Sequence, residues 1–259
     1  KRIMNRLAFM GVTLAAAVAA ACTTMPAGAP ASVVVATPMP PLTIYHLEGR
    51  RSERIVWLME ELGFPYELKF VRGNMSASLA ELRRVNPAMP VAPTVFYGDE
   101  ILVESGALLD IILNRHAPGK LIPPLASQDY AWHTIWMHYA EGSLFSRILA
   151  DYRVWQIQPP TQKGRLVDAG GVIRYAEDFL GKHPYFGGSE FSAADIMMQF
   201  PLEYAFRINI VDKSGFPNIN AWNAKMMARP AYQRMNAKAE PDGFLSPPEP
   251  LPDNARAPG

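Results

Sequence analysis

Between residues 42 and 116, short strand-like runs alternate with helix-spaced apolar residues, and this pattern limits the fold more than any other feature of the chain. The first strand-like run, 42–47, precedes a helix pattern that stops at Gly63 and Pro65. The following segments are a strand at 66–71, a helix at 79–85, a hairpin formed by 94–97 and 101–103, and a helix at 105–115. This order predicts a small mixed sheet with helices on both of its faces.

From Ser127 onward the chain shows only helix-like segments. They span approximately 127–152, 161–181, 192–207 and 217–238, and the last is interrupted at Arg229-Pro230. Ser192 and Asp195 are close to the spacing of a capping box, in which a hydroxyl and a carboxylate fix the first helical turn. The predicted fold is therefore an α/β thioredoxin-like domain at 42–117 followed by an all-α domain at 126–238.

The first 22 residues are predicted to be an export signal and not part of the fold. Lys1, Arg2 and Arg6 precede an apolar run that is short for a membrane span and ends at Cys22. Small residues before this cysteine resemble a bacterial lipobox, in which the cysteine becomes lipid-modified; plain cleavage in the Ala-rich run is the alternative. Both interpretations predict an exported protein, located in the bacterial periplasm or anchored to a membrane through Cys22.

Proline-rich stretches flank the predicted folded region. Residues 23–41 are rich in Pro, Ala and Thr, and such a composition favours an extended tether because it buries little apolar surface. The stretch 239–259 has a similar composition and is predicted to be a disordered tail.

Composition and charge exclude several classes of function. The net charge is +1 and no basic stripe is visible, which argues against nucleic acid as a partner. A single cysteine excludes an internal disulfide and a thiolate metal cage, and the five histidines are scattered. No metal ion is therefore expected.

Glu104 and Ser105 lie where a strand pattern changes into a helix pattern. A helix start exposes unpaired N–H groups and a partial positive charge, so it can bind a carboxylate. A glutamate beside it offers a negative charge to an ammonium. Together they predict a site for a free α-amino acid end, against the alternative of an N-cap serine next to a solvated glutamate.

Several stretches of this chain resemble the soluble glutathione transferases, in particular a fungal and bacterial subgroup. Residues 42–47 and 51–68 are similar to the first strand, first helix and second strand of that family. The segments 136–144, 191–195, 217–222 and 228–232 are similar to its helical domain. The resemblance covers about 42–236 and implies the same two-domain fold, with homodimers as a plausible assembly.

The resemblance implies that glutathione is the ligand and co-substrate. It assigns the γ-glutamyl end of glutathione to Glu104 and Ser105. It also implies a cis proline before the third strand, where Ala92-Pro93 stands, with the backbone of Ala92 pairing with the cysteinyl part of glutathione. An ordinary trans turn at Pro93 is the alternative.

The sequence offers more than one residue that could activate the thiol of glutathione. In the most similar subgroup a serine is expected four residues before Arg54, but Arg50 stands there. Ser52 at the helix start or Tyr45 at the strand end could donate a hydrogen bond to the thiolate, and Arg50 with Arg51 could stabilise it by charge alone. The alternatives are an N-cap role for Ser52, a core ring for Tyr45 and a solvated pair of arginines.

The sequence therefore predicts an exported enzyme that adds glutathione thiolate to a small hydrophobic electrophile, or reduces hydroperoxides with the same thiolate. Apolar residues of the helical domain, including Trp136 and Tyr139, are predicted to bind the electrophile. The alternative function is a non-catalytic, membrane-tethered module that binds glutathione or hydrophobic compounds.

Overall fold

The computed structural model describes residues 35–157, 168–242, 248–252 and 255. The predicted export signal with Cys22, and the first part of the predicted tether, lie outside the described residues. Within the rest of the predicted tether, Thr37 donates a backbone hydrogen bond of 2.8 Å to the carbonyl of Arg115. This stretch of coil is therefore attached to the folded region before the first strand begins.

The first domain contains a four-stranded mixed sheet with the strand order β2-β1-β3-β4. Its elements are β1 (Leu42–Tyr45), α1 (Glu53–Leu62), β2 (Glu67–Lys69), α2 (Met75–Val85), β3 (Thr94–Tyr97), β4 (Glu100–Val103) and α3 (Ser105–His116). Strand β1 runs parallel to β2 and antiparallel to β3, with Ile44 opposite Val95. Gly63 ends α1 in the left-handed conformation, at φ 68°, which glycine adopts without steric cost.

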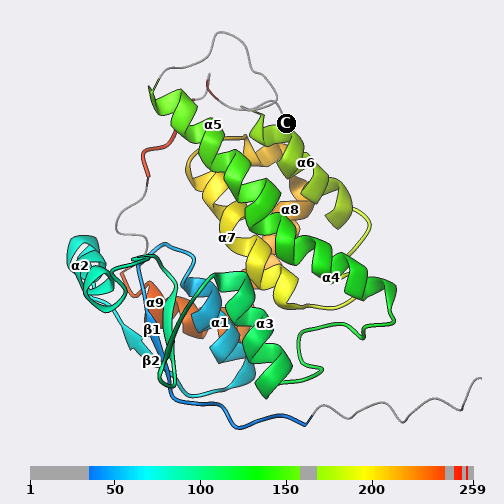
Figure 1. Ribbon diagram of the computed structural model, residues 1–259. Helices are drawn as coiled ribbons and strands as arrows, with labels where there is room; N and C mark the ends of the chain where they lie inside the picture. The colour runs from blue at the N-terminus through cyan, green and yellow to red at the C-terminus, as the bar shows by residue number, and fades with distance from the viewer. Residues whose placement is uncertain (1–34, 158–167, 243–247, 253–254, 256–259) are drawn as a thin grey trace, which may run out of the picture. The chain divides into compact units, whose positions relative to one another are not determined.

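The second domain consists of helices, as the sequence predicts (Figure 1). They are α4 (Gln128–Tyr139), the π-helical turn η1 (Ala140–Phe145), α5 (Ser146–Ile157), α6 (Ala169–Leu180), α7 (Ala193–Arg207), the short 3₁₀ helix η2 (Lys213–Gly215), α8 (Pro217–Met227) and α9 (Pro230–Ala239). The predicted helix at 127–152 is continuous but contains the π-helical turn. The capping box of Ser192 and Asp195 is present at the start of α7.

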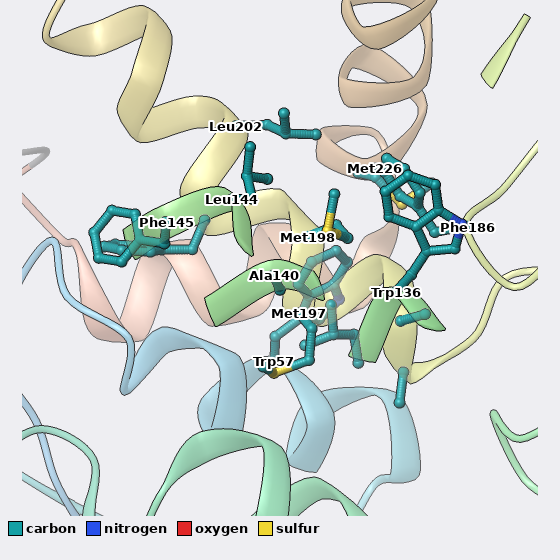
Figure 2. Packing of buried hydrophobic residues seen from close by; sticks show 14 of the residues in the cluster. Trp57, Trp136, Ala140, Leu144, Phe145, Phe186, Met197, Met198, Leu202 and Met226 are labelled. Carbon is teal, nitrogen blue, oxygen red and sulfur yellow. The ribbon is translucent and has the colours of Figure 1, made fainter. Parts of the chain in front are cut away.

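One apolar core joins the two domains. Trp57 of α1 is 2% exposed and lies in the same cluster as Trp136 of α4 and Met197 of α7 (Figure 2). Helix α1 packs against both α7 and α9, so its apolar face is covered from the helical side. Full burial of each large apolar side chain contributes about 2 kcal/mol to the free energy of folding. Because α1 is held in this way, the loop that leads into it also lies near the helical domain.

Part of the predicted disordered tail is packed onto the helical domain. Leu251 is 6% exposed, and its backbone N–H donates to the carbonyl of Ile208 at 2.8 Å. The hydroxyl of Tyr152 donates to the carbonyl of Glu249 at 2.7 Å. The difference from the prediction has a local cause. Ile208 follows α7, where carbonyls lack intrahelical partners, so the extended segment 248–252 can donate a hydrogen bond there and bury Leu251.

Candidate active site

The start of α3 combines an exposed acid with a buried hydroxyl. Glu104 is exposed and has φ 70° and ψ 104°, a conformation that costs a non-glycine residue about 1–3 kcal/mol. Such outliers concentrate at ligand sites. The first hydrogen bond of the helix runs from the N–H of Leu108 to the carbonyl of Glu104, at 2.9 Å. The N–H groups of residues 105–107 precede this pattern and form a positive helix end.

Ser105 and Glu104 differ in exposure although they are adjacent in the sequence. Ser105 is 4% exposed, and its hydroxyl oxygen lies 3.0 Å from Nη1 of Arg54. The carboxylate of Glu104 instead faces the surface. The helix end that lies between them, rather than the serine hydroxyl alone, offers donors to a ligand carboxylate.

Arg54 connects this helix end to the second domain. Its guanidinium is 1% exposed and donates to Oε1 of Glu141 at 2.6 Å and to the carbonyl of Met197 at 2.7 Å. Burial lowers the pKa of Arg54, and the Glu141 carboxylate opposes this effect. Sequence reasoning missed Arg54, although a charged residue inside the apolar face of a helix is a recognisable signal.

Glu141 binds a second arginine from the loop before α1. Nε of Arg51 lies 2.9 Å from each carboxylate oxygen of Glu141, and the Arg51 guanidinium lies 4.4 Å from the centre of the Phe145 ring. Burial acts to raise the pKa of Glu141, but Arg54 and Arg51 hold it below its usual range. The π-helical turn places Glu141 and Phe145 at this contact. A chain of direct contacts thus runs from Arg51 through Glu141 and Arg54 to Ser105.

The hydroxyl of Ser52 is used inside the protein. Ser52 is fully buried, and its oxygen lies 2.8 Å from Nδ1 of His46 and 3.2 Å from the N–H of Leu47. Nε2 of His46 lies 2.9 Å from the carbonyl of Ala239, which fixes the proton of the neutral ring on Nε2. Burial lowers the pKa of His46 to about 4, so the ring is neutral at pH 7. Ser52 therefore donates its hydrogen bond to Nδ1 of His46, and its hydroxyl hydrogen is not directed toward a thiolate.

Tyr45 and Arg50 occupy different environments. Tyr45 is 5% exposed and packs against Leu47, Leu82 and the ring of Phe96, whose centre is 5.1 Å away. It matches the alternative of a core ring at the strand end. Arg50 is partly exposed, and its Nη1 donates to the carbonyl of Gly49 at 2.8 Å. The two neighbouring arginines, 50 and 51, therefore stand at the N-terminal end of α1.

Trp136 and Tyr139 do not line a pocket toward the first domain, which corrects the prediction for these two residues. Trp136 is fully buried, and its ring packs against Phe179 and Phe186 at centroid distances of 4.9 and 4.7 Å. The hydroxyl of Tyr139 donates to the carbonyl of Val172 at 3.0 Å. Both side chains point toward α6, because the aromatic face of α4 forms the centre of the helical domain.

The peptide bond between Ala92 and Pro93 is cis, as the resemblance implies. It stands directly before β3, and Pro93 is buried while Ala92 is partly exposed. The backbone of Ala92 is thus accessible at the end of the central strands.

Two negative findings concern the described residues only. Their His, Cys, Asp and Glu side chains form no group of three or more that could hold a metal ion. None of their helices has both the length and the apolar character needed to cross a membrane.

Comparison with known protein families matches both domains. Residues 40–114 match the family model of the glutathione S-transferase N-terminal domain, and residues 160–230 match that of the C-terminal domain. The chain belongs to the glutathione S-transferase family. The predicted fold class, a thioredoxin-like domain followed by a helical domain, is thereby confirmed.

Similar transferases occur in fungi and bacteria. Glutathione S-transferase 3 of Schizosaccharomyces pombe is 25% identical, over 83% of this chain and 99% of that protein. A glutathione S-transferase structure from Actinobacillus pleuropneumoniae is 28% identical with a TM-score of 0.68, covering 79% of this chain and 94% of the other. A theta class glutathione S-transferase from Xanthomonas axonopodis pv. citri, with glutathione bound, is 25% identical with a TM-score of 0.56, covering 76% and 97%.

Proposed function

We propose that this protein is a glutathione transferase that joins glutathione to a small hydrophobic electrophile, and that it activates the thiol with arginine side chains instead of a hydroxyl. Family membership and the geometry at the start of α3 support glutathione as the co-substrate. The environment of Ser52 is the observation that carries the second part of the proposal.

Glutathione would bind with its γ-glutamyl end at the start of α3. Its carboxylate would accept hydrogen bonds from the open N–H groups of 105–107, with the charge of Arg54 directly behind Ser105. Its ammonium would pair with the exposed carboxylate of Glu104. The N–H and C=O groups of Ala92 would pair with the cysteinyl backbone like an added strand.

The thiol must lose its proton before it can attack, because only the thiolate is a strong nucleophile. A free thiol has a pKa near 8.5, so about 3% is ionised at pH 7. Arg50, Arg51 and the N-terminal end of α1 supply positive charge beside the end of β1, which favours the anion. Ser52 and Tyr45 remain predictions for this role, but the structure gives both a structural use.

The reaction is a nucleophilic addition or displacement. The thiolate sulfur forms a bond to the electrophilic carbon, and the electron pair moves onto the acceptor or leaves with the displaced group. Arginine charge and the fixed position of the thiol supply the rate enhancement.

We also propose that the protein is exported. The residue pattern at 1–22 supports this proposal.

A titration of the thiol tests this proposal. Glutathione is added to the protein, and thiolate absorbance of the complex is followed against pH. We expect a bound thiol pKa at least one unit below the free value of about 8.5. Binding with an unshifted pKa would instead support a non-catalytic binding module, and no binding at millimolar glutathione would refute both.

A further inference from the structure

The end of α9 and Glu240 after it contact the loop between β1 and α1. Nε2 of His46 donates to the carbonyl of Ala239 at 2.9 Å, and the N–H of Gly49 donates to Oε1 of Glu240. Asp242 pairs with Arg72 in the turn before α2. Segments nearly two hundred residues apart in sequence therefore meet at the loop that carries Arg50 and Arg51.

Gly49 is the residue of this loop that most needs an external anchor. Its φ is 65°, in the left-handed region, where glycine has no side chain to fix the backbone. It directly precedes Arg50, and the Arg50 guanidinium donates back to its carbonyl. The direction of the Gly49 peptide group therefore helps to set where the arginine side chains start.

The carboxyl group of Glu240 is buried, and its two oxygens have different partners. Glu240 is 7% exposed, Oε1 accepts from Gly49, and Oε2 has no N–H donor among the described residues. The carboxyl of Glu53 lies close enough to that of Glu240 for the two to interact, and the repulsion between them raises the pKa of Glu53. Two carboxylates have no donor to offer each other, whereas a proton on one of them would allow a hydrogen bond within the pair.

Several titratable or charged groups surround this pair. They are the neutral ring of His46, whose Nε2 lies 3.8 Å from Oε1, Glu48 in the same loop, Arg54 of α1, Arg207 of α7 and Tyr232 of α9. Burial raises the pKa of Glu53 and of Glu240, and the repulsion between the two acts in the same direction on Glu53. With both carboxyls ionised, the buried charge of Glu240 would lie against the half-buried charge of Glu53.

We propose that Glu240 is a positioning residue for the thiol site: by accepting the Gly49 N–H, it sets the place of Arg50 and Arg51. This inference rests on the proposed role of those arginines. It also assigns a function to the residues that follow α9, since Glu240 can hold Gly49 only while these residues stay packed against the loop.

Two substitutions separate the parts of this proposal. Glu240→Gln keeps a carbonyl oxygen for Gly49 and gains an NH₂ group that donates to Glu53 in either protonation state. Glu240→Ala removes both contacts. Glu81→Gln is the matched control, because Glu81 is an exposed acid of α2 paired with Arg84. All are made in the full chain.

Amide hydrogen exchange of residues 47–54 is the first measurement, since it needs neither glutathione nor activity. At fixed pH we expect the amides of residues 47–54 to exchange about 10-fold faster in Glu240→Ala than in wild type. In Glu240→Gln and in the control, the exchange rates should stay within about 2-fold of wild type. The second measurement is the pKa of bound glutathione thiol. It should rise in Glu240→Ala and return to the wild-type value in Glu240→Gln.

Each outcome decides the matter. Unchanged exchange in Glu240→Ala would contradict the proposal that Glu240 holds the loop at Gly49. Faster exchange with an unchanged pKa of the bound thiol would show that Glu240 stabilises the loop but does not position the arginines for the thiol. If Glu240→Ala does not fold, exchange of the Gly49 amide is measured in wild type and in Glu240→Gln. We expect this amide to be protected from exchange in both proteins. Exchange of the Gly49 amide in wild type as fast as in an unstructured peptide would contradict the proposal. If wild type does not bind glutathione, the proposed function fails, while exchange still tests the anchor.

Discussion

Arg54 donates a hydrogen bond from Nη1 to the hydroxyl oxygen of Ser105 at 3.0 Å. The serine oxygen accepts this bond, so its own proton points elsewhere, and the contact it makes is a weak one to the Met197 sulfur at 3.9 Å. A carboxylate is a much stronger acceptor than a thioether. Arg54 therefore prepares Ser105 as a donor and places a full positive charge behind the helix end.

Arg54→Lys should weaken glutathione binding. A lysine ammonium cannot reach Ser105, Glu141 and the carbonyl of Met197 at once, because it lacks the planar fork of the guanidinium. We expect KM for glutathione to rise about 10-fold, equal to roughly 1.4 kcal/mol, with a smaller change in kcat. Steady-state kinetics at saturating electrophile measure this. Arg84→Lys, in an exposed pair, is the control, and an unchanged KM would contradict the role of Arg54.

Arg51→Ala should raise the pKa of bound glutathione thiol by about one unit, because a positive charge beside the thiolate is removed. Thiolate absorbance against pH measures the change, and Arg84→Ala serves as the comparison. The same titration in Tyr45→Phe should show no shift, since Tyr45 packs among core side chains. A shift in Tyr45→Phe but not in Arg51→Ala would return the thiol donor to the tyrosine.

Ser52→Ala should cost stability and leave thiol chemistry intact. The change removes the donor to Nδ1 of buried His46, at a cost of about 1–3 kcal/mol in the free energy of unfolding. Urea unfolding measures the loss. The pKa of bound thiol, read at a temperature where the variant is folded, should equal that of wild type, and an increase would show that Ser52 donates to the thiolate.

The sequence predicted the element order well because the relevant signals are local. Gly63 ends α1, Ser192 and Asp195 cap α7, and Pro230 separates α8 from α9. Apolar periodicity identified the helices that form the core. Such signals need no knowledge of which distant segments meet.

The site was predicted less completely, because its geometry depends on contacts between distant segments. The sequence shows Arg54 as a charge inside an apolar helix face, but its role follows only from its contacts with Ser105 and Glu141. His46 accepts the hydrogen bond of the Ser52 hydroxyl because the carbonyl of Ala239, far along the chain, fixes the tautomer of its ring. Residue type alone cannot reveal such a relationship.

Trp136 is a residue that the sequence assigned to the site and that the structure places in the core. An aromatic-rich helix is compatible with a ligand pocket and with a core, and here Trp136 is fully buried against the core rings of Phe179 and Phe186. Trp136→Phe should therefore lower the melting temperature by a few degrees and leave KM for the electrophile within about 2-fold of wild type. Kinetics with a neutral aromatic electrophile and a thermal unfolding scan test this pair of expectations. A KM change of about 10-fold without loss of stability would restore the predicted pocket.

Glu53→Gln should be more stable than wild type, and the difference should grow as the pH rises. Burial raises the pKa of Glu53 in the folded state, so above the pKa of the unfolded chain, about 4.3, the folded state binds a proton that the unfolded state has released. Stability of wild type therefore falls with increasing pH until Glu53 ionises in the folded state. Glutamine donates to Glu240 without binding a proton and escapes this loss. Unfolding midpoints of the two proteins should coincide near pH 4 and diverge in favour of Glu53→Gln toward pH 8, with Glu81→Gln following wild type throughout. Parallel curves would mean that Glu53 is ionised in the folded protein and shares no proton with Glu240.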